Sequence, residues 1–272
     1  MLKAALLVLA VTTLLVGVIL VAPYGIDWNR NIRPATLAFL HGENPYNIPE
    51  FLNPPWTLVL LAPFVLLPEP LGRAALFVVS LALLAVVLQW HKAIPLTAAL
   101  YLTTPMALAM LQVGNLEAFV LFGLCLPLPF AALLLLVKPQ VGLVPLALMV
   151  WIHFRDKGWR QTGAALTPAM VLLVLSFLAY GNWPMQALNG LNNGGISGHI
   201  WPLGVPTGFL CAYTAFRERI PGLALIASPL LSPHVSSHSW LGALLAAVRR
   251  ADHMVIVWLG CWLVVLILAI PT

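Results

Sequence analysis

The sequence contains few charged residues. Only 8% of its 272 residues are Asp, Glu, Lys or Arg, 61% are hydrophobic, and the mean hydropathy is +0.98. Soluble domains carry roughly 25% charged residues, so this composition excludes a water-soluble domain. Because lipid offers no hydrogen-bond partners to the backbone, apolar segments of this kind must form helices or closed barrels. The long apolar runs predict an all-α polytopic membrane protein.

Cysteines are also few. Cys125, Cys211 and Cys261 are odd in number and lie inside apolar runs, so we expect them to pack as small hydrophobic side chains. The net charge of +5 would suggest a nucleic-acid partner in a soluble protein. In a membrane protein it is typical of Lys and Arg residues that hold loops on the cytoplasmic side, so we expect no nucleic-acid partner.

Charges, prolines and glycines divide the chain into about 9 to 11 spanning or half-spanning helices. The N-terminal apolar run is too long for the core of a signal peptide and predicts a retained first span. No repeat or soluble segment interrupts the pattern, which predicts one membrane domain over residues 1–272. The candidate segments are 4–22, 54–68, 74–90, 95–111, 115–137, 139–153, 163–181, 203–217, 220–233, 239–248 and 253–270.

With the N-terminus inside, these segments place most basic residues on the cytoplasmic side, as the positive-inside rule requires. Lys92 is the exception. The same topology places a first extracytoplasmic loop at 23–53 and a second, larger one at 182–202 on the outer side, together with Lys138 and residues 234–238. The residues predicted to be cytoplasmic are Arg73, Arg155, Lys157, Arg160, Arg217, Arg219, Arg249 and Arg250.

The first outer loop is polar and has its own helical pattern. Pro34 suits the first turn of a short interfacial helix, and Gly42 and Pro45 would end it. "NPPW" at 53–56 then begins the next span with proline in the first turn.

Several short motifs in the chain resemble one family. "LQVGNLEAFVL" at 111–121 resembles its "GQ.N" element, "LLLVKPQVGLVPL" its "KP" element, and "LLSPHVSSHSW" its "SP.SW.H" element. The family is the GT-C superfamily of polytopic glycosyltransferases, and the closest resemblance is to glycosyltransferase family 87, the polyprenyl-phosphate-mannose-dependent group. The matching residues in the N-terminal part are Asp27, Leu40, Gly42, Asn44, Pro45, Tyr46, Pro54, Pro55 and "PFVLLP" at 63–68.

This resemblance implies transfer of a sugar, expected to be a hexose such as mannose, from a polyprenyl-phosphate donor to a lipid or lipid-linked acceptor on the extracytoplasmic face. It also implies an acidic residue after the first span, and Asp27 is the candidate general base. The alternatives for Asp27 are a helix cap and an ion-pair partner of Arg30. Glu43 and Glu50 are secondary candidate acids that are also expected to be solvated among turn residues.

Cationic residues are the candidates for holding the donor phosphate. Lys138 lies in an apolar run, where a cation is costly unless paired; the alternative is that it snorkels to the interface. His234 and His238 are four residues apart, a spacing that would place both imidazoles on one helical face. They could contact phosphate or simply form a polar turn, and no metal site is expected from them.

The remaining candidates carry weaker signals. Arg30 and Arg33 could contact the donor phosphate or anionic lipid headgroups. His199 could line the site or belong to a flexible outer loop. Glu117 is expected to be structural, either paired or near a helix N-terminus.

Two other functions compete with a glycosyltransferase. A transporter or lipid carrier would also have broken helices and buried charges. A non-catalytic assembly partner with the same fold is the third possibility. The expected setting is a bacterial cytoplasmic membrane with the active site facing outward and no cofactor; whether a metal is required stays open.

Overall fold

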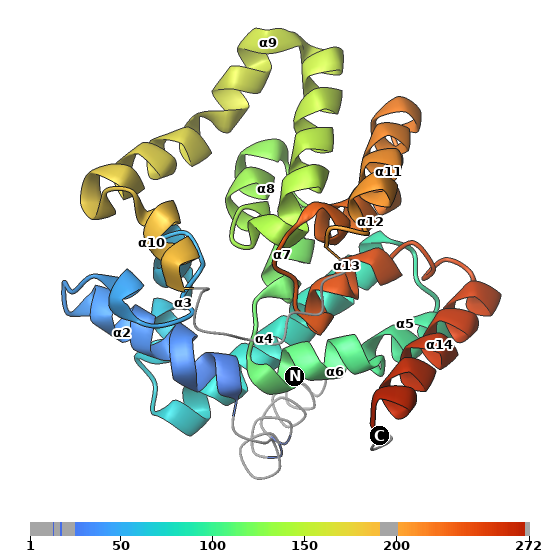
Figure 1. The fold of residues 1–272 in the computed structure, drawn as a ribbon, viewed down its shortest axis with the longest axis horizontal. Helices are drawn as coiled ribbons and strands as arrows, with labels where there is room; N and C mark the ends of the chain where they lie inside the picture. The colour runs from blue at the N-terminus through green and yellow to red at the C-terminus, as the bar shows by residue number, and fades with distance from the viewer. Residues whose placement is uncertain (1–12, 14–16, 18–24, 191–200, 270–272) are drawn as a thin grey trace, which may run out of the picture. The chain divides into compact units, whose positions relative to one another are not determined.

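The computed structural model is helical, as the sequence predicts. It describes residues 13, 17, 25–190 and 201–269, and over these residues it contains 13 α-helices and no strand (Figure 1). The predicted first span at 4–22, except Thr13 and Gly17, and the candidate His199 lie outside the described residues.

The chain divides into two compact units. Unit 1 comprises residues 1–82, 111–115 and 174–195, and unit 2 comprises residues 83–110, 116–173 and 196–272. Three helices carry residues of both units, namely α4 (Glu69–Trp90), α6 (Pro105–Val113) and α9 (Pro139–Tyr180).

In unit 1, the polar loop contains a helix close to the predicted one. A π-helical turn, η1 (Trp28–Ile32), leads directly into α2 (Arg33–Leu40), which has Pro34 in its first turn. Gly42 follows with a φ of +77°, a conformation that glycine adopts readily and that ends the helix. The 3₁₀ turn η2 (Pro45–Asn47) then leads to α3 (Trp56–Val65), which packs on α2.

The second segment that the sequence predicts as an outer loop is also partly helical. α10 (Trp183–Gly190) begins inside the segment predicted as a loop at 182–202. Tyr46 of η2 stacks on Trp183, with ring centroids 5.7 Å apart, and Asn44 Nδ2 donates to Oε1 of Gln186 at 3.0 Å. These contacts join α10 to the first polar loop.

Prolines break two of the predicted spans. The segment 95–111 forms α5 (Pro95–Leu102) and α6, which meet at an angle of 57° before Pro105. The segment 115–137 forms α7 (Glu117–Gly123) and α8 (Leu128–Leu135), separated by the proline-containing stretch "LCLP". Proline lacks the N–H that would continue the helical hydrogen bonds, so each predicted span is shortened at this point.

Within the described part of the chain, two helices are long and apolar enough to cross a membrane, namely α4 and α9, or up to three if the bent pair α5 and α6 counts as one span. α9 contains a non-helical residue, Gly158, with a φ of +78°, which lies between the predicted spans 139–153 and 163–181.

The C-terminal part of unit 2 consists of shorter helices. α11 packs against α12, which in turn contacts η4 and α13, while α14 packs on α5. Their bounds are α11 Val205–Glu218, α12 Pro221–Leu231, η4 Ser237–Trp240, α13 Leu241–Leu244 and α14 Ala251–Ala269.

Candidate functional site

Asp27 is positioned by its neighbour Trp28, the largest fully buried side chain of unit 1. A Cβ added to Gly72 would lie 3.3 Å from the Trp28 ring, and one added to Gly114 would lie 2.9 Å from the Trp28 Cβ. Trp28 therefore fits only because both neighbours lack a side chain. The Trp28 indole is completely buried.

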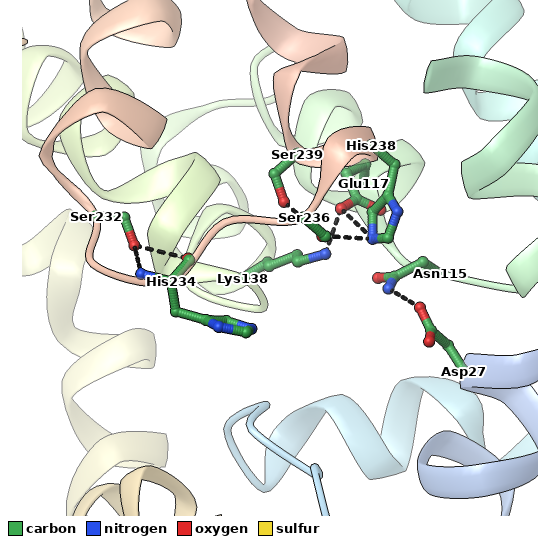
Figure 2. Close-up of polar contacts among 9 residues, drawn as sticks. All are labelled: Asp27, Asn115, Glu117, Lys138, Ser232, His234, Ser236, His238 and Ser239. Carbon is green, nitrogen blue, oxygen red and sulfur yellow. Dashed lines mark hydrogen bonds and ion pairs between the residues drawn. The ribbon is translucent and has the colours of Figure 1, made fainter. Parts of the chain in front are cut away.

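The Asp27 carboxylate contacts an amide from another of the motifs that carry the family resemblance. Asn115 Nδ2 donates to Asp27 Oδ2 at 2.5 Å, and both residues belong to unit 1 (Figure 2). Asp27 stands at the N-terminus of η1, but its side chain makes no capping hydrogen bond to that helix. A neutral amide donor orients a carboxylate without neutralising it, which suits a general base.

We expect Gly114→Ala to destabilise the environment of Asp27. Gly114 has a φ of +78° and adjoins Trp28, so alanine meets both backbone strain and steric overlap, for a loss of about 2 to 5 kcal/mol of unfolding free energy. Gly42→Ala is the matched control, because Gly42 has a φ of +77° with nothing within 4 Å of an added Cβ. The Gly42→Ala variant should lose only the unfolding free energy that backbone strain costs, about 1 to 2 kcal/mol. Chemical denaturation measures the loss of unfolding free energy in each variant. Equal losses for Gly114→Ala and Gly42→Ala would show that the packing of Trp28 does not depend on Gly114.

In unit 2, three charged or ionisable side chains from distant motifs meet. Lys138 Nζ forms an ion pair with Glu117 Oε1, and His238 Nε2 lies 3.4 Å from the same oxygen (Figure 2). All three side chains are buried, with Glu117 completely inaccessible. We call these three residues the Glu117 cluster. An isolated charge in such a place is strongly unfavourable, so each charge in the cluster depends on its partner.

Hydroxyl groups orient the histidine of the Glu117 cluster. Ser236 Oγ lies 2.8 Å from His238 Nε2 and 3.1 Å from Ser239 Oγ. The 3₁₀ turn that carries His238 leads to Leu241, whose carbonyl accepts a hydrogen bond of 3.0 Å from the buried Tyr101 hydroxyl of α5. The Ser236 hydroxyl therefore holds the imidazole, and the Tyr101 hydrogen bond holds the turn that carries it.

The Glu117 cluster retains one unsatisfied acceptor. Among the described residues, Glu117 Oε2 is buried and has no hydrogen-bond partner. A buried acceptor without a partner costs free energy, and such exceptions are concentrated at functional sites. With Glu117 and Lys138 both ionised, the cluster is neutral, and protonation of His238 would make it positive.

The structure also gives the surroundings of His234 and of the Lys138 head group. His234 lies in a non-helical turn, where its backbone N–H and C=O both bond to the Ser232 hydroxyl. The prediction that His234 and His238 share one helical face was wrong, because residues 232–236 are not helical and helical spacing does not apply to them. Lys138 turns inward to Glu117, so its head does not extend to the surface of the described chain.

The candidate residues of the first polar loop differ in their exposure to solvent. Arg30 is exposed at the end of η1, whereas Arg33 is half-buried, with its Nε shielded from solvent. Glu43 and Glu50 are both exposed among turn residues. Asp27 belongs to unit 1 and the Glu117 cluster to unit 2.

Sequence reasoning gave no functional role to Asn115, Glu117, Ser236 or Tyr101. Glu117 does lie in the first turn of α7, as expected, and it is also the hub of the cluster. One signal was available, since Glu117 is the sole charged residue between Lys92 and Lys138. A single acid in an apolar segment of that length requires a partner, and Lys138 ends the same segment.

No protein-family model, curated protein or solved structure matches the chain. Within the described part of the chain, no group of three or more His, Cys, Asp or Glu residues is arranged to hold a metal ion. The function is therefore argued from the contacts above and from the sequence motifs that supply them.

Proposed function

We propose that this protein is a multi-pass membrane glycosyltransferase that moves a hexose from a polyprenyl-phosphate donor to a lipid or lipid-linked acceptor on the extracytoplasmic face. One observation carries the proposal. Three separate motifs that resemble family 87 contribute Glu117, Lys138 and His238, and the Lys138 and His238 side chains both contact Glu117. Asp27 and Asn115, from two of the resembling elements, are likewise hydrogen-bonded.

The proposed reaction needs one base and one stabiliser of the leaving group. The acceptor hydroxyl oxygen attacks the anomeric carbon of the donor and forms the new glycosidic bond, while Asp27 takes the hydroxyl proton. The bond from the anomeric carbon to the phosphate oxygen breaks, and polyprenyl phosphate leaves with the bonding electrons. Lys138 and His238 offset the negative charge that develops on that phosphate.

Glu117 has a supporting role in this scheme. A cation buried in apolar surroundings is costly unless it is paired, and Glu117 supplies the partner of Lys138. Lys138 Nζ and His238 Nε2 both contact Oε1 of Glu117. Glu117 therefore holds together the two side chains that are proposed to contact the phosphate. Glu117 is thus a positioning residue in the proposal and takes no proton from the acceptor.

The direct test is a transfer assay in membranes. Membranes with and without the protein would receive radiolabelled polyprenyl-phosphate hexose, and labelled lipid product would be extracted and counted. We expect protein-dependent product, with release of unlabelled polyprenyl phosphate in equal amount. If the donor binds to the purified protein but no acceptor fraction gains label, the protein is a non-catalytic member of the fold.

We expect His238→Gln to lower kcat/KM for the donor. A hydrogen bond from a charged group is worth about 1.5 to 3 kcal/mol, so the expected loss is about ten- to a hundredfold. His234→Gln is the matched control, because its backbone is held by Ser232 and it lies outside the Glu117 cluster. A larger loss in the His234 variant would contradict the assignment of His238.

A further inference from the structure

A second charged region lies far from the Glu117 cluster in the sequence, where α9 is interrupted and α11 ends. Both segments belong to unit 2. Five cations outnumber two acids here, and all seven side chains are exposed. The residues are Arg155, Asp156, Lys157, Arg160, Arg217, Glu218 and Arg219.

Two of these guanidinium groups lie over one ring. The Cζ atoms of Arg155 and Arg219 each lie 5.7 Å from the centre of the Trp151 ring, within cation–π distance. Trp151 itself packs edge-on against Phe216 of α11, with ring centroids 5.9 Å apart. A cation–π contact does not use the N–H groups of a guanidinium as hydrogen-bond donors, so they can still bind an anion.

The backbone and an ion pair hold Arg219 in this position. Arg219 adopts a left-handed conformation at the end of α11, with a φ of +54°, and its Nη1 lies 3.3 Å from Asp156 Oδ1. Arg155 and Arg219, which are far apart in the sequence, therefore present their guanidinium groups at the same ring. A surface that attracts anions only by its net charge would not need arginines held in fixed positions.

The surroundings match the headgroup layer of a membrane. Trp159 is 70% exposed and carries Arg160 over its ring, and Phe154 is 47% exposed. The apolar stretches 139–153 and 163–180 of α9 flank the charged residues on both sides. Exposed aromatic residues beside arginines at the end of apolar helices are typical of the membrane–water interface.

We propose that Trp151, Arg155 and Arg219 form a binding site for the phosphate of an anionic phospholipid headgroup. The planar guanidinium groups fit two oxygens of a phosphodiester, and the excess of cations favours a lipid with net negative charge over a zwitterionic one. This site is independent of the proposed sugar transfer and does not require it.

The test is titration of the purified protein with phosphatidylglycerol or phosphatidylcholine, with bound lipid counted by native mass spectrometry. We expect preference for phosphatidylglycerol. A variant with both Arg155→Ala and Arg219→Ala should bind it about five- to thirtyfold more weakly, because one cation near an anionic lipid is worth about 1 kcal/mol. Phosphatidylcholine carries the same phosphodiester beside a cationic choline, so its binding should be weaker from the start and should fall by a smaller factor.

Two further variants separate a built site from general charge. The double variant Arg155→Lys and Arg219→Lys keeps both charges but replaces the planar guanidinium groups with ammonium groups. We expect an intermediate loss of lipid affinity. Arg249→Ala with Arg250→Ala removes two exposed arginines elsewhere in unit 2 and should leave binding unchanged. Three results would overturn the proposal. The first is full affinity in either Arg155/Arg219 variant, and the second is an equal loss of affinity in the Arg249/Arg250 control. The third is complete displacement of the lipid by inorganic phosphate.

Discussion

Replacing Asp27 with asparagine is expected to lower the rate of sugar transfer by about a hundred- to ten-thousandfold, the usual contribution of a general base. Asparagine has nearly the same shape and retains an oxygen that can accept the hydrogen bond from Asn115. The variant should therefore fold and enter the membrane normally. It should also bind the polyprenyl-phosphate donor with unchanged affinity, because Asp27 has no part in holding the phosphate.

Two exposed acids of the same loop serve as controls for Asp27. Glu43→Gln and Glu50→Gln also remove a negative charge, but both side chains are solvated, so transfer should continue near the wild-type rate. Initial rates in membranes, normalised to the amount of protein, are the measurement. Full activity of Asp27→Asn would remove Asp27 as the base. Loss of activity only in Glu43→Gln or Glu50→Gln would reassign the base to that residue.

The second large effect concerns stability. Glu117→Gln and Lys138→Met each leave a buried charge without its counter-ion, and breaking such a pair costs about 3 to 5 kcal/mol. The double variant removes both charges, so it should lose less unfolding free energy than either single variant. Thermal and denaturant unfolding of the detergent-solubilised protein would measure all four forms.

The exposed pair Arg250 and Asp252 gives the comparison for the Glu117 cluster. Their closest atoms are 2.6 Å apart, but both side chains are solvated, so Asp252→Asn should change stability far less than Glu117→Gln does. Simple addition of the two single losses in the Glu117 and Lys138 double variant would mean that the ion pair is not coupled. In that case Glu117 would not be the positioning partner of Lys138 that the proposal requires.

Local features of the sequence predicted much of the fold. Pro34 and Gly42 gave a helix in the polar loop, and the structure has α2 from Arg33 to Leu40. The apolar runs predicted helices throughout, and α4 and α9 contain segments long enough to span a membrane. These features depend on neighbours a few residues apart, because proline and glycine restrict or release the backbone at their own positions.

The breaks in two predicted spans also follow from local features. Prolines divide these spans into α5 with α6 and α7 with α8, in line with the expectation that some segments form half-spanning helices. Packing decided other features. Trp28 is completely buried, and Gly72 and Gly114 lie against it without side chains of their own.

The sequence by itself determined that this chain is apolar and helical, and it singled out Asp27, Lys138 and His238 as unusual polar residues. Only the tertiary structure decided that Lys138 and His238 share Glu117 and that Asp27 is hydrogen-bonded to Asn115. The reason is physical. A buried charge must find a partner, but the chain between Glu117 and His238 can fold back in many ways, so packing of whole helices selects which partner it meets.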